Sequence, residues 1–366
     1  MEDEQLANIY ATQKSLTEWF KEIGHPDAEA LQREDSEKSD RLRLLHEIAG
    51  LPYGERVRFD AVEVTKDNPA FAMYLDEHRS KICGLRLVPK EDNLPKIRTL
   101  GKSVADAFSW FQEQAVDQSR YWVDFFPIEA EDLWATIFIV NQYGIHGEII
   151  AGSHHQLTQG VHDHTPLIVF DFDFKNWHLE PQNPGAKDHL RSLIEHLHIT
   201  DAAVRSVLEK ELSVTFAQDY IEGYWETTHS SEVTRFIDYS PRIGKMYADL
   251  HVMTPQKNLK ASLHGHTGGP GKADGTARIV LPEAIASTDF SEGEILICPV
   301  TTPDYIPLMQ KAAAIVAEGG GILSHAVIIA REMKKPCIVG VSGAITTLKN
   351  GQFVSVDADS GTLTLD

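Results

Sequence analysis

Residues 319–333 read Gly-Gly-Gly-Ile-Leu-Ser-His-Ala-Val-Ile-Ile-Ala-Arg-Glu-Met and follow an apolar strand pattern at residues 313–317. We expect a helix to begin at about Ser324, a plausible N-cap residue. Consecutive glycines let a backbone approach a ligand closely. A helix N-terminus adds free N–H groups and the positive end of a dipole. The stretch therefore predicts a phosphate-binding segment made of Gly319, Gly320, Gly321 and Ser324.

His325 is the candidate catalytic residue, because it falls in the first turn of this expected helix. A histidine that accepts a phosphoryl group must present an unprotonated ring nitrogen. The positive helix end disfavours the imidazolium form and stabilises an added phosphate. Arg331 is a further candidate for phosphate binding, with an ion pair to Glu318 or Glu332 as its alternative role. The alternative for His325 is an ordinary helix-capping histidine.

Motifs on both sides of this stretch complete a family pattern. This part of the sequence resembles the phosphohistidine (mobile, swivelling) domain of the phosphoenolpyruvate-utilising enzymes. Members of that family include phosphoenolpyruvate synthase, pyruvate phosphate dikinase and rifampicin phosphotransferase. The resemblance covers about residues 265–366 and implies that His325 carries a phosphoryl group; Val327 is a conservative departure from the family's usual Ala. The matching segments are Gly275–Val280, Gly293–Ile297, Thr302–Asp304, Pro336–Gly340, Asp357 and Gly361.

A phosphohistidine needs a phosphoryl donor, and two acidic segments offer a site for one. Asp219–Gly223 and Asp238–Gly244 each put carboxylates on a strand, and such a pair can hold Mg²⁺ between triphosphate oxygens. The second segment resembles the ATP-grasp motif acid-x-Asn-Pro-Arg-x-Gly, with Ser in the Asn position. These segments predict a magnesium site at Glu222, Asp238 and Ser240, with Arg242 beside the nucleotide. The alternative is a set of turn or strand-edge carboxylates without a chemical role.

Other candidate nucleotide-binding residues come from three places. Glu148 lies in a segment, Gly144–Gly152, similar to the Gly-x-x-Gly-Glu segment of the same enzymes, and Glu129 ends a stretch that could lie beside adenine. The family's Arg-Ser-Ser stretch is missing. Four cations close together form a possible anion site in an acidic chain, or else a solvated loop. They are Arg86, Lys90, Lys96 and Arg98.

A run of histidines follows the glycine segment. His154, His155, His162 and His164 could bind a transition metal, but no Cys or carboxylate spacing supports a fixed tetrahedral site. A contact with substrate or phosphate, together with Gln156, Thr158 and Gln159, is the favoured interpretation.

The fold class that we expect is α/β, with two or three domains in 366 residues. We expect a helical segment at 1–50, an α+β ATP-grasp-like nucleotide-binding domain at 51–255, a linker at 256–275 and a compact α/β swivelling phosphohistidine domain at 276–366. Within the second region, residues 185–212 are predicted to be helical, and residues 214–224 and 232–238 to be strands.

Composition limits the partners and the compartment. The formal net charge is −20, which disfavours nucleic acid and anionic membranes as partners. The three cysteines are far apart and indicate no disulfide scaffold. The first residues are acidic and no apolar run approaches membrane-spanning length, so we expect a cytoplasmic protein.

The expected function is an ATP-dependent phosphotransferase that uses ATP and Mg²⁺ to charge His325 and then serves a small-molecule acceptor that the sequence does not identify. The barrel domain that follows the phosphohistidine domain in phosphoenolpyruvate synthase is not found before Asp366. The acceptor is therefore expected elsewhere on the chain or on a partner protein. Two alternatives stay open: a phosphohistidine carrier charged by a partner protein, and an ATP-dependent biosynthetic ligase.

Overall fold

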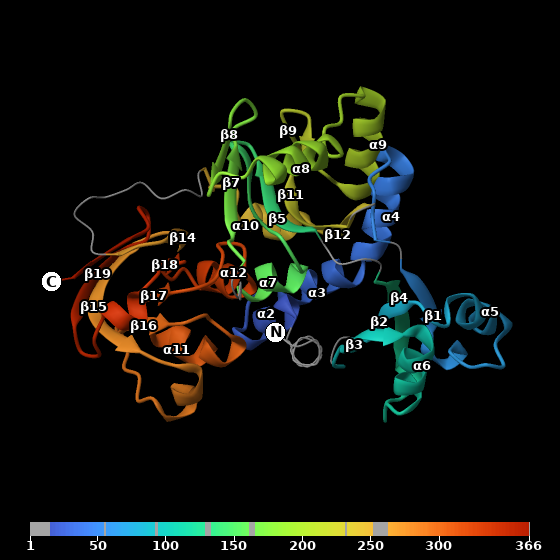
Figure 1. Cartoon of the computed structure of the whole chain (residues 1–366), viewed down its shortest axis with the longest axis horizontal. Coiled ribbons are helices and arrows are strands. Elements are labelled where there is room, and N and C mark those ends of the chain that lie inside the picture. The colour runs from blue at the N-terminus through green and yellow to red at the C-terminus, as the bar shows by residue number, and fades with distance from the viewer. Residues whose placement is uncertain are drawn as a thin grey trace.

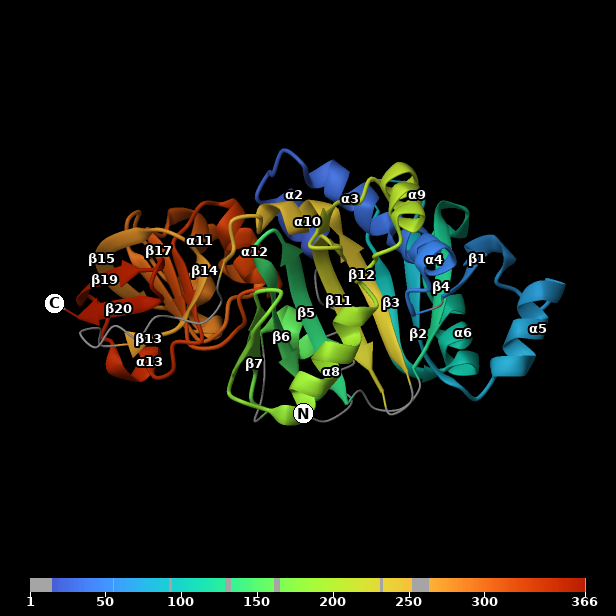
Figure 2. The same cartoon turned by 90° about the horizontal axis from the view of Figure 1, so that it is seen from above.

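The computed structural model describes residues 15–54, 56–91, 94–128, 133–160, 165–230, 233–251 and 263–365. Three bodies lie in a row: a small sheet, a central sheet with most of the helices, and a C-terminal sheet (Figures 1 and 2). The described residues contain no helix that combines the length and the apolar character needed to cross a membrane. The α/β class predicted from the sequence is confirmed.

The small sheet has four antiparallel strands in the order β1-β4-β2-β3. Side chains such as Leu85, Leu87 and Phe125 alternate into its core and meet Phe71 and Phe111 from two helices. Each helix begins where the sequence supplies a cap: the Asn68 side chain accepts from Phe71 N–H and that of Ser103 from Asp106 N–H. The elements are β1 Val57–Asp60, α5 Pro69–His78, β2 Ile82–Pro89, β3 Ile97–Ser103, α6 Val104–Gln112 and β4 Tyr121–Pro127, with 3-10 turns at Ala61–Glu63 and Gln118–Arg120.

The central sheet has six antiparallel strands in the order β12-β11-β5-β6-β7-β8. Both of its faces are buried. Along β5, Ile137 and Ile139 enter one apolar cluster, whereas Phe138 and Val140 enter another, as the period of two along a strand requires. The strands are β5 Trp134–Asn141, β6 Gly144–Ile150, β7 Ile168–Phe172, β8 Trp177–Glu180, β11 Gly223–His229 and β12 Thr234–Ser240, beside a short hairpin of β9 Phe216–Ala217 and β10 Tyr220–Ile221.

Helices cover both faces of this sheet. On one face Leu42, Leu45 and Leu190 pack against the strands, and on the other Trp19, Phe20 and Leu31 do so. The run predicted as helical at 185–212 is two helices, because the Asp201 side chain accepts from Ala203 and Val204 N–H and starts a new one. The helices are α2 Leu16–Glu22, α3 Ala28–Ser36, α4 Lys38–Ala49, α7 His154–Gln159, α8 Pro184–Glu195, α9 Ala202–Leu212 and α10 Pro241–Met246.

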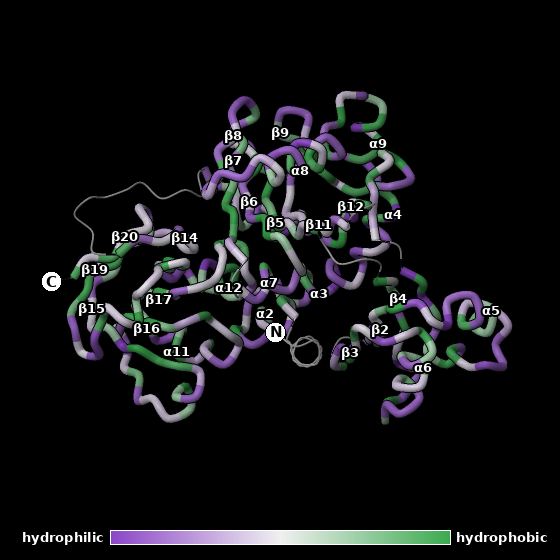
Figure 3. Tube along the Cα trace, viewed as in Figure 1, coloured by the Kyte–Doolittle hydropathy of each residue, from purple (hydrophilic) through white to green (hydrophobic). Residues whose placement is uncertain are grey.

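The C-terminal sheet has eight strands in the order β13-β20-β19-β15-β16-β17-β18-β14, of which β15 to β18 are parallel. β16 and β5 are mainly hydrophobic (Figure 3). Ile295 and Ile297 of β16 enter a core of the C-terminal body. Leu296 and Cys298 instead join the cluster that includes Trp19 and Phe20, so apolar packing continues between the C-terminal and central bodies. The elements are β13 Leu263–His264, β14 His266–Gly269, β15 Lys272–Ile279, β16 Ile295–Cys298, α11 Ile306–Lys311, β17 Ala314–Ala317, α12 His325–Glu332, β18 Cys337–Val339, α13 Ala344–Thr347, β19 Phe353–Asp357 and β20 Thr362–Leu365, with 3-10 turns at Pro282–Ser287 and Pro303–Tyr305.

The predicted linker at 256–275 differs from the structure over its described part. Residues 263–269 form β13 and β14, and β15 begins at Lys272. The glycines there are needed for packing, since a Cβ at Gly265 or Gly269 would collide with backbone carbonyls of Val339 or Lys335. The described residues of the predicted linker therefore contribute the two edge strands of the C-terminal sheet, β13 and β14, and the start of β15. All three cysteines are buried and free.

Candidate functional site

His325 begins α12, as the sequence indicated, directly after the glycine-rich turn. Gly320 adopts a φ of +94°, which favours glycine. Ser324 occupies the N-cap position with an extended backbone, although its side chain makes no capping hydrogen bond. Ala326 to Ala330 are buried, so α12 is anchored in the core, and His325 at its first position is half-buried.

The His325 ring lies within electrostatic reach of charged groups from the other two bodies. Burial lowers its pKa to about 4; Glu226 opposes this effect, while His154, Arg98 and Lys38 add to it. Its Nδ1 atom is buried and has no hydrogen-bond partner among the described residues. The ring is therefore neutral at neutral pH, with a lone pair available, which is the form that a nucleophilic histidine requires.

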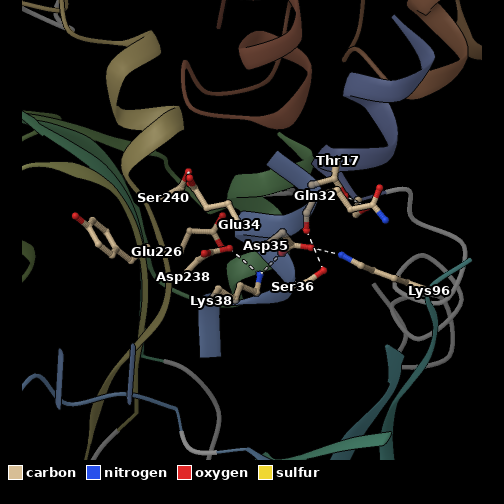
Figure 4. Close-up of polar contacts among 12 residues, drawn as sticks. Thr17, Gln32, Glu34, Asp35, Ser36, Lys38, Lys96, Glu226, Asp238 and Ser240 are labelled. Carbon is tan, nitrogen blue, oxygen red and sulfur yellow. Dashed lines mark hydrogen bonds and ion pairs between the residues drawn. The ribbon is translucent and has the colours of Figure 1, made fainter. Parts of the chain in front are cut away.

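Glu226 and Asp238 form the acidic part of the site (Figure 4). They lie directly opposite each other on the paired strands β11 and β12. The Tyr224 hydroxyl donates to Glu226 Oε1 over 2.6 Å, and His154 Nε2 lies 3.0 Å from Glu226 Oε2. Burial would raise the pKa of Glu226, but the neighbouring His154, Lys38 and Tyr224 hydroxyl hold it at about 2. This carboxylate is therefore ionised at neutral pH.

Two N-terminal helices bring charged groups beside this pair (Figure 4). Lys38 Nζ lies 2.7 Å from Asp238 Oδ2 and 2.9 Å from Asp35 Oδ1, and Asp35 also pairs with Lys96 of the small body. Burial would raise the pKa of Asp35, but Lys38 and Lys96 hold it well below its usual range. Asp35 is thus an anion held between two lysines.

The predicted basic residues separate into two groups. Arg86 and Lys96 line a small cleft, and Arg98 of β3 is close enough to lower the pKa of His325. Lys90 is engaged elsewhere, with Asp60 Oδ2 at 2.6 Å. Glu129 lies outside the described residues. The cleft is lined by Asp35, Ser36, Ser39, Arg56, Arg58, Arg86, Val88, Lys96 and Asp124.

Ser240 and Arg242 meet a carboxylate from α3. The Ser240 hydroxyl donates to Glu34 and accepts from Ile243 N–H, so it caps α10. The guanidinium of Arg242 lies 3.2 Å from Glu34 Oε2. Glu222, which the sequence suggested as a magnesium ligand, lies just before β11 begins at Gly223. The residue that pairs with Asp238 across the two strands is Glu226.

Glu148 and Arg331 lie at the contact between the central and C-terminal bodies. The Glu148 carboxylate accepts from Ile322 N–H at 2.6 Å and Leu323 N–H at 3.4 Å. Arg331 donates to the Met246 carbonyl and pairs with Asp249. The structure therefore directs both residues to the interface of the two bodies, with Glu148 bound just before the helix that carries His325 and Arg331 in the last turn of that helix.

Among the clustered histidines that the structure describes, His154 lies 3.0 Å from Glu226 and within electrostatic reach of His325. His154 and His155 begin α7 instead of lying in a loop, and His162 and His164 lie outside the described residues. The part of the chain that the structure describes holds no group of three or more His, Cys, Asp or Glu side chains arranged for a metal. A metal at this site would thus take further oxygens from a ligand.

Sequence reasoning missed Glu226, Lys38, Asp35 and Glu34. Glu226 had a detectable signal, since it lies on the strand preceding Asp238 and the two flank a turn. Lys38 and Asp35 had none, because the stretch around them is a charge-dense helical segment of ordinary appearance. Their place in the site follows from tertiary packing.

Comparisons with known proteins single out the C-terminal body. Residues 290–361 match the family described as PEP-utilising enzyme, mobile domain. A probable phosphoenolpyruvate synthase of Staphylothermus marinus is 29% identical over 191 residues, which are 50% of this chain and 22% of that protein. The phosphotransferase YvkC of Bacillus subtilis, described as uncharacterized, is 38% identical over 114 residues, 31% of this chain and 14% of its own length.

The chain thus spans about a fifth or less of the length of these relatives. Among solved structures, a D-alanine–D-alanine ligase from Bacillus anthracis complexed with ATP aligns with 66% of this chain and 68% of its own, at 10% identity and a TM-score of 0.30. The resemblance seen in the sequence is confirmed for the C-terminal body: residues 290–361 match the mobile domain of PEP-utilising enzymes.

Proposed function

We propose that this chain is an ATP-dependent phosphotransferase in which His325 takes a phosphoryl group from a nucleotide bound between the small and central sheets. The C-terminal body then delivers the group to a small-molecule acceptor. The observation that carries the proposal is the position of the His325 ring at the end of α12. It lies within electrostatic reach of Glu226, His154, Lys38 and Arg98, which come from four elements of the other two bodies.

The charge around His325 suits attack on phosphorus. The low pKa of the ring leaves a neutral nitrogen at neutral pH. In the reaction, that nitrogen attacks the γ phosphorus of ATP and ADP leaves, or it attacks the β phosphorus and AMP leaves. In both cases a P–N bond forms and the P–O bond to the departing nucleotide breaks. In the second case His325 first carries a pyrophosphoryl group, whose γ phosphate water then removes as inorganic phosphate. Lys38, Lys96, Arg86 and Arg98 would stabilise the negative charge on the phosphate oxygens, which provides most of the catalysis in phosphoryl transfer.

Glu226 and Asp238 would hold Mg²⁺. Carboxylate oxygens are the donors that this ion prefers, and it binds through one or two carboxylates plus substrate phosphates. The donor set fits, because two ionisable side chains face each other on neighbouring strands and one of them is held ionised. Bound there, the ion would neutralise charge on the transferred phosphoryl group. Glu226 replaces Glu222 in this proposal, because Glu226 is the residue paired with Asp238.

The test is incubation of the protein with Mg²⁺ and ATP labelled separately at the β and γ phosphates. The proposal expects acid-labile, base-stable label on His325, and the nucleotide product distinguishes β transfer (AMP) from γ transfer (ADP). His325→Ala is the control and should carry no label. Label that persists in this variant would contradict the role of His325.

A specific contact favours a second candidate, a phosphohistidine carrier charged by a partner protein. Asp35 occupies Lys38 and Lys96, and Glu34 occupies Ser240 and Arg242. Carboxylates thus already neutralise groups that a triphosphate would use. Failure of the full chain to bind Mg²⁺–ATP in a calorimetric titration would support this candidate over the phosphotransferase.

A further inference from the structure

The glycine-rich turn before His325 is held by a carboxylate from a different body of the protein. Glu148 lies on β6 of the central sheet, whereas Ile322 and Leu323 precede α12 of the C-terminal body. The two N–H groups that donate to Glu148 lie three and two residues before His325. Any change in this contact therefore acts directly on the position of the nucleophile.

Glu148 is an unusual residue for a core. Its side chain is fully buried, and its named hydrogen-bond donors are backbone amides. An isolated buried carboxylate is unfavourable, because it loses its hydration. Burial accordingly raises its pKa to about 7, although the two amides work in the opposite direction. A residue placed here for packing alone would be apolar, so the contact calls for a reason other than core stability.

A second side chain of the central body binds the same segment through the carbonyl of Ile322. The Tyr247 hydroxyl, which also belongs to the central body, donates to the Ile322 carbonyl over 3.0 Å. Tyr247 is buried, and Arg331 of α12 lies over its ring at 4.7 Å. The peptide between Ile322 and Leu323 therefore has both of its polar groups bound by side chains of the central body. Its C=O accepts from Tyr247 and its N–H donates to Glu148.

Close backbone approach makes this grip possible. A Cβ at Gly321 would overlap the carboxylate of Glu148, and a Cβ at Gly160, after α7, would collide with the Cα of Gly320. Gly321 has no positive φ. Its lack of a side chain is thus explained by the space that Glu148 occupies and not by backbone conformation.

We propose that Glu148 is a docking residue that holds the C-terminal body against the central sheet, in the position where His325 lies within electrostatic reach of Glu226. The contact is made in the docked arrangement and given up when the body moves away to deliver its phosphoryl group. Once released, Glu148 regains water and the two amides become available to another acceptor. The docking contact itself needs no nucleotide, whereas its effect on the phosphorylation of His325 rests on the proposed function.

Hydrogen–deuterium exchange on the full chain without nucleotide tests the contact. The probes are the amides of Ile322 and Leu323, and β16 serves as the reference for an intact C-terminal sheet. Glu148→Gln keeps the shape but not the charge, and Gly321→Ala opposes the contact from the other body. We expect exchange at the two amides to rise at least tenfold in both variants, with β16 unchanged.

Glu294→Gln is the matched control. Glu294 is also a buried carboxylate that accepts from a backbone amide, that of Ser291, and it pairs with Arg278 as well, but all three residues lie in the C-terminal body. The Glu294→Gln variant should leave hydrogen exchange at the amides of Ile322 and Leu323 unchanged. Unaltered exchange at these amides in both Glu148→Gln and Gly321→Ala, with the protein folded, would overturn the proposal.

The second readout is the rate at which His325 is labelled at saturating ATP. Glu148→Gln should reduce this rate about tenfold while leaving nucleotide affinity unchanged, since a docking defect acts after binding. Equal loss of affinity and rate would place Glu148 in nucleotide binding and overturn its docking role. If the wild-type protein takes no label from ATP, the proposed function fails, while the exchange experiment still decides whether Glu148 docks the body.

Discussion

Glu226 on β11 and Asp238 on β12 face each other across an antiparallel ladder, twelve residues apart in the sequence. Each is bound to a cationic or ionisable group from a helix, Glu226 to His154 at 3.0 Å and Asp238 to Lys38 at 2.7 Å. The register shifts directly after this pair, between Glu226 and Thr227. The carboxylates therefore lie at an irregularity of the sheet, a feature that often re-aims side chains near active sites.

Removing either charge of this pair should weaken nucleotide binding. Glu226→Gln and Asp238→Asn each keep the side-chain shape but remove a ligand for Mg²⁺. We expect Mg²⁺–ATP affinity to fall roughly tenfold or more in each variant. Calorimetric titration measures this, with Glu222→Gln as the comparison. If Glu222→Gln lost more affinity for Mg²⁺–ATP than Glu226→Gln, Glu222 and not Glu226 would be the magnesium ligand.

His325→Ala should abolish the phosphoryl-enzyme and leave nucleotide binding intact. The ring makes no hydrogen bond through Nδ1 among the described residues, so few contacts are lost with it. Acid-labile label and ATP affinity are measured on the same preparation. Loss of ATP binding together with the label would indicate that the ring supports the nucleotide site instead of accepting the phosphoryl group.

Asp35→Asn should strengthen nucleotide binding. Its ionised carboxylate pairs with Lys38 and Lys96, so removing it frees Lys96 for phosphate oxygens and leaves Lys38 paired with Asp238. We expect affinity for ATP to rise roughly fivefold to tenfold, equivalent to about 1 kcal/mol. Glu47→Gln, an exposed carboxylate of α4 paired with Arg43, is the matched control. A weaker affinity in Asp35→Asn would mean that Asp35 organises the lysines and does not compete with the nucleotide.

Glu148 should make stability depend on pH. Burial raises its pKa from an ordinary 4.5 to about 7, so its contribution is fully present below pH 4.5 and is lost as the pH rises through 7. Gln does not titrate, so the difference in unfolding free energy between wild type and Glu148→Gln isolates this effect. Between pH 4.5 and pH 8 we expect the wild type to lose about 3 kcal/mol of unfolding free energy relative to Glu148→Gln.

Urea unfolding of both proteins across this pH range measures the effect. A difference between wild type and Glu148→Gln that stays constant with pH would show that Glu148 keeps an ordinary pKa in the folded protein.

Much of the local structure could be predicted from the sequence. The start of α12 at His325 follows from a strand, three glycines and a serine at the N-cap position. The hairpin between β5 and β6 follows from Asn141 and Gly144, and the Asn141 side chain indeed accepts from Tyr143 N–H. The break between α8 and α9 was missed because the local cap at Asp201 outweighed the helical periodicity of the whole run.

The site as a whole could not be predicted. By itself, the sequence determined the helix that carries His325, the strand that carries Asp238 and the family of the C-terminal body. Tertiary structure alone decided that Lys38 meets Asp238 across 200 residues and that Glu148 meets Ile322 across 174. Caps, turns and hydrophobic periods act within about a dozen residues and leave a readable pattern. The pairing of distant charges is set by which faces the packed sheets and helices bury, so it leaves no local pattern to read.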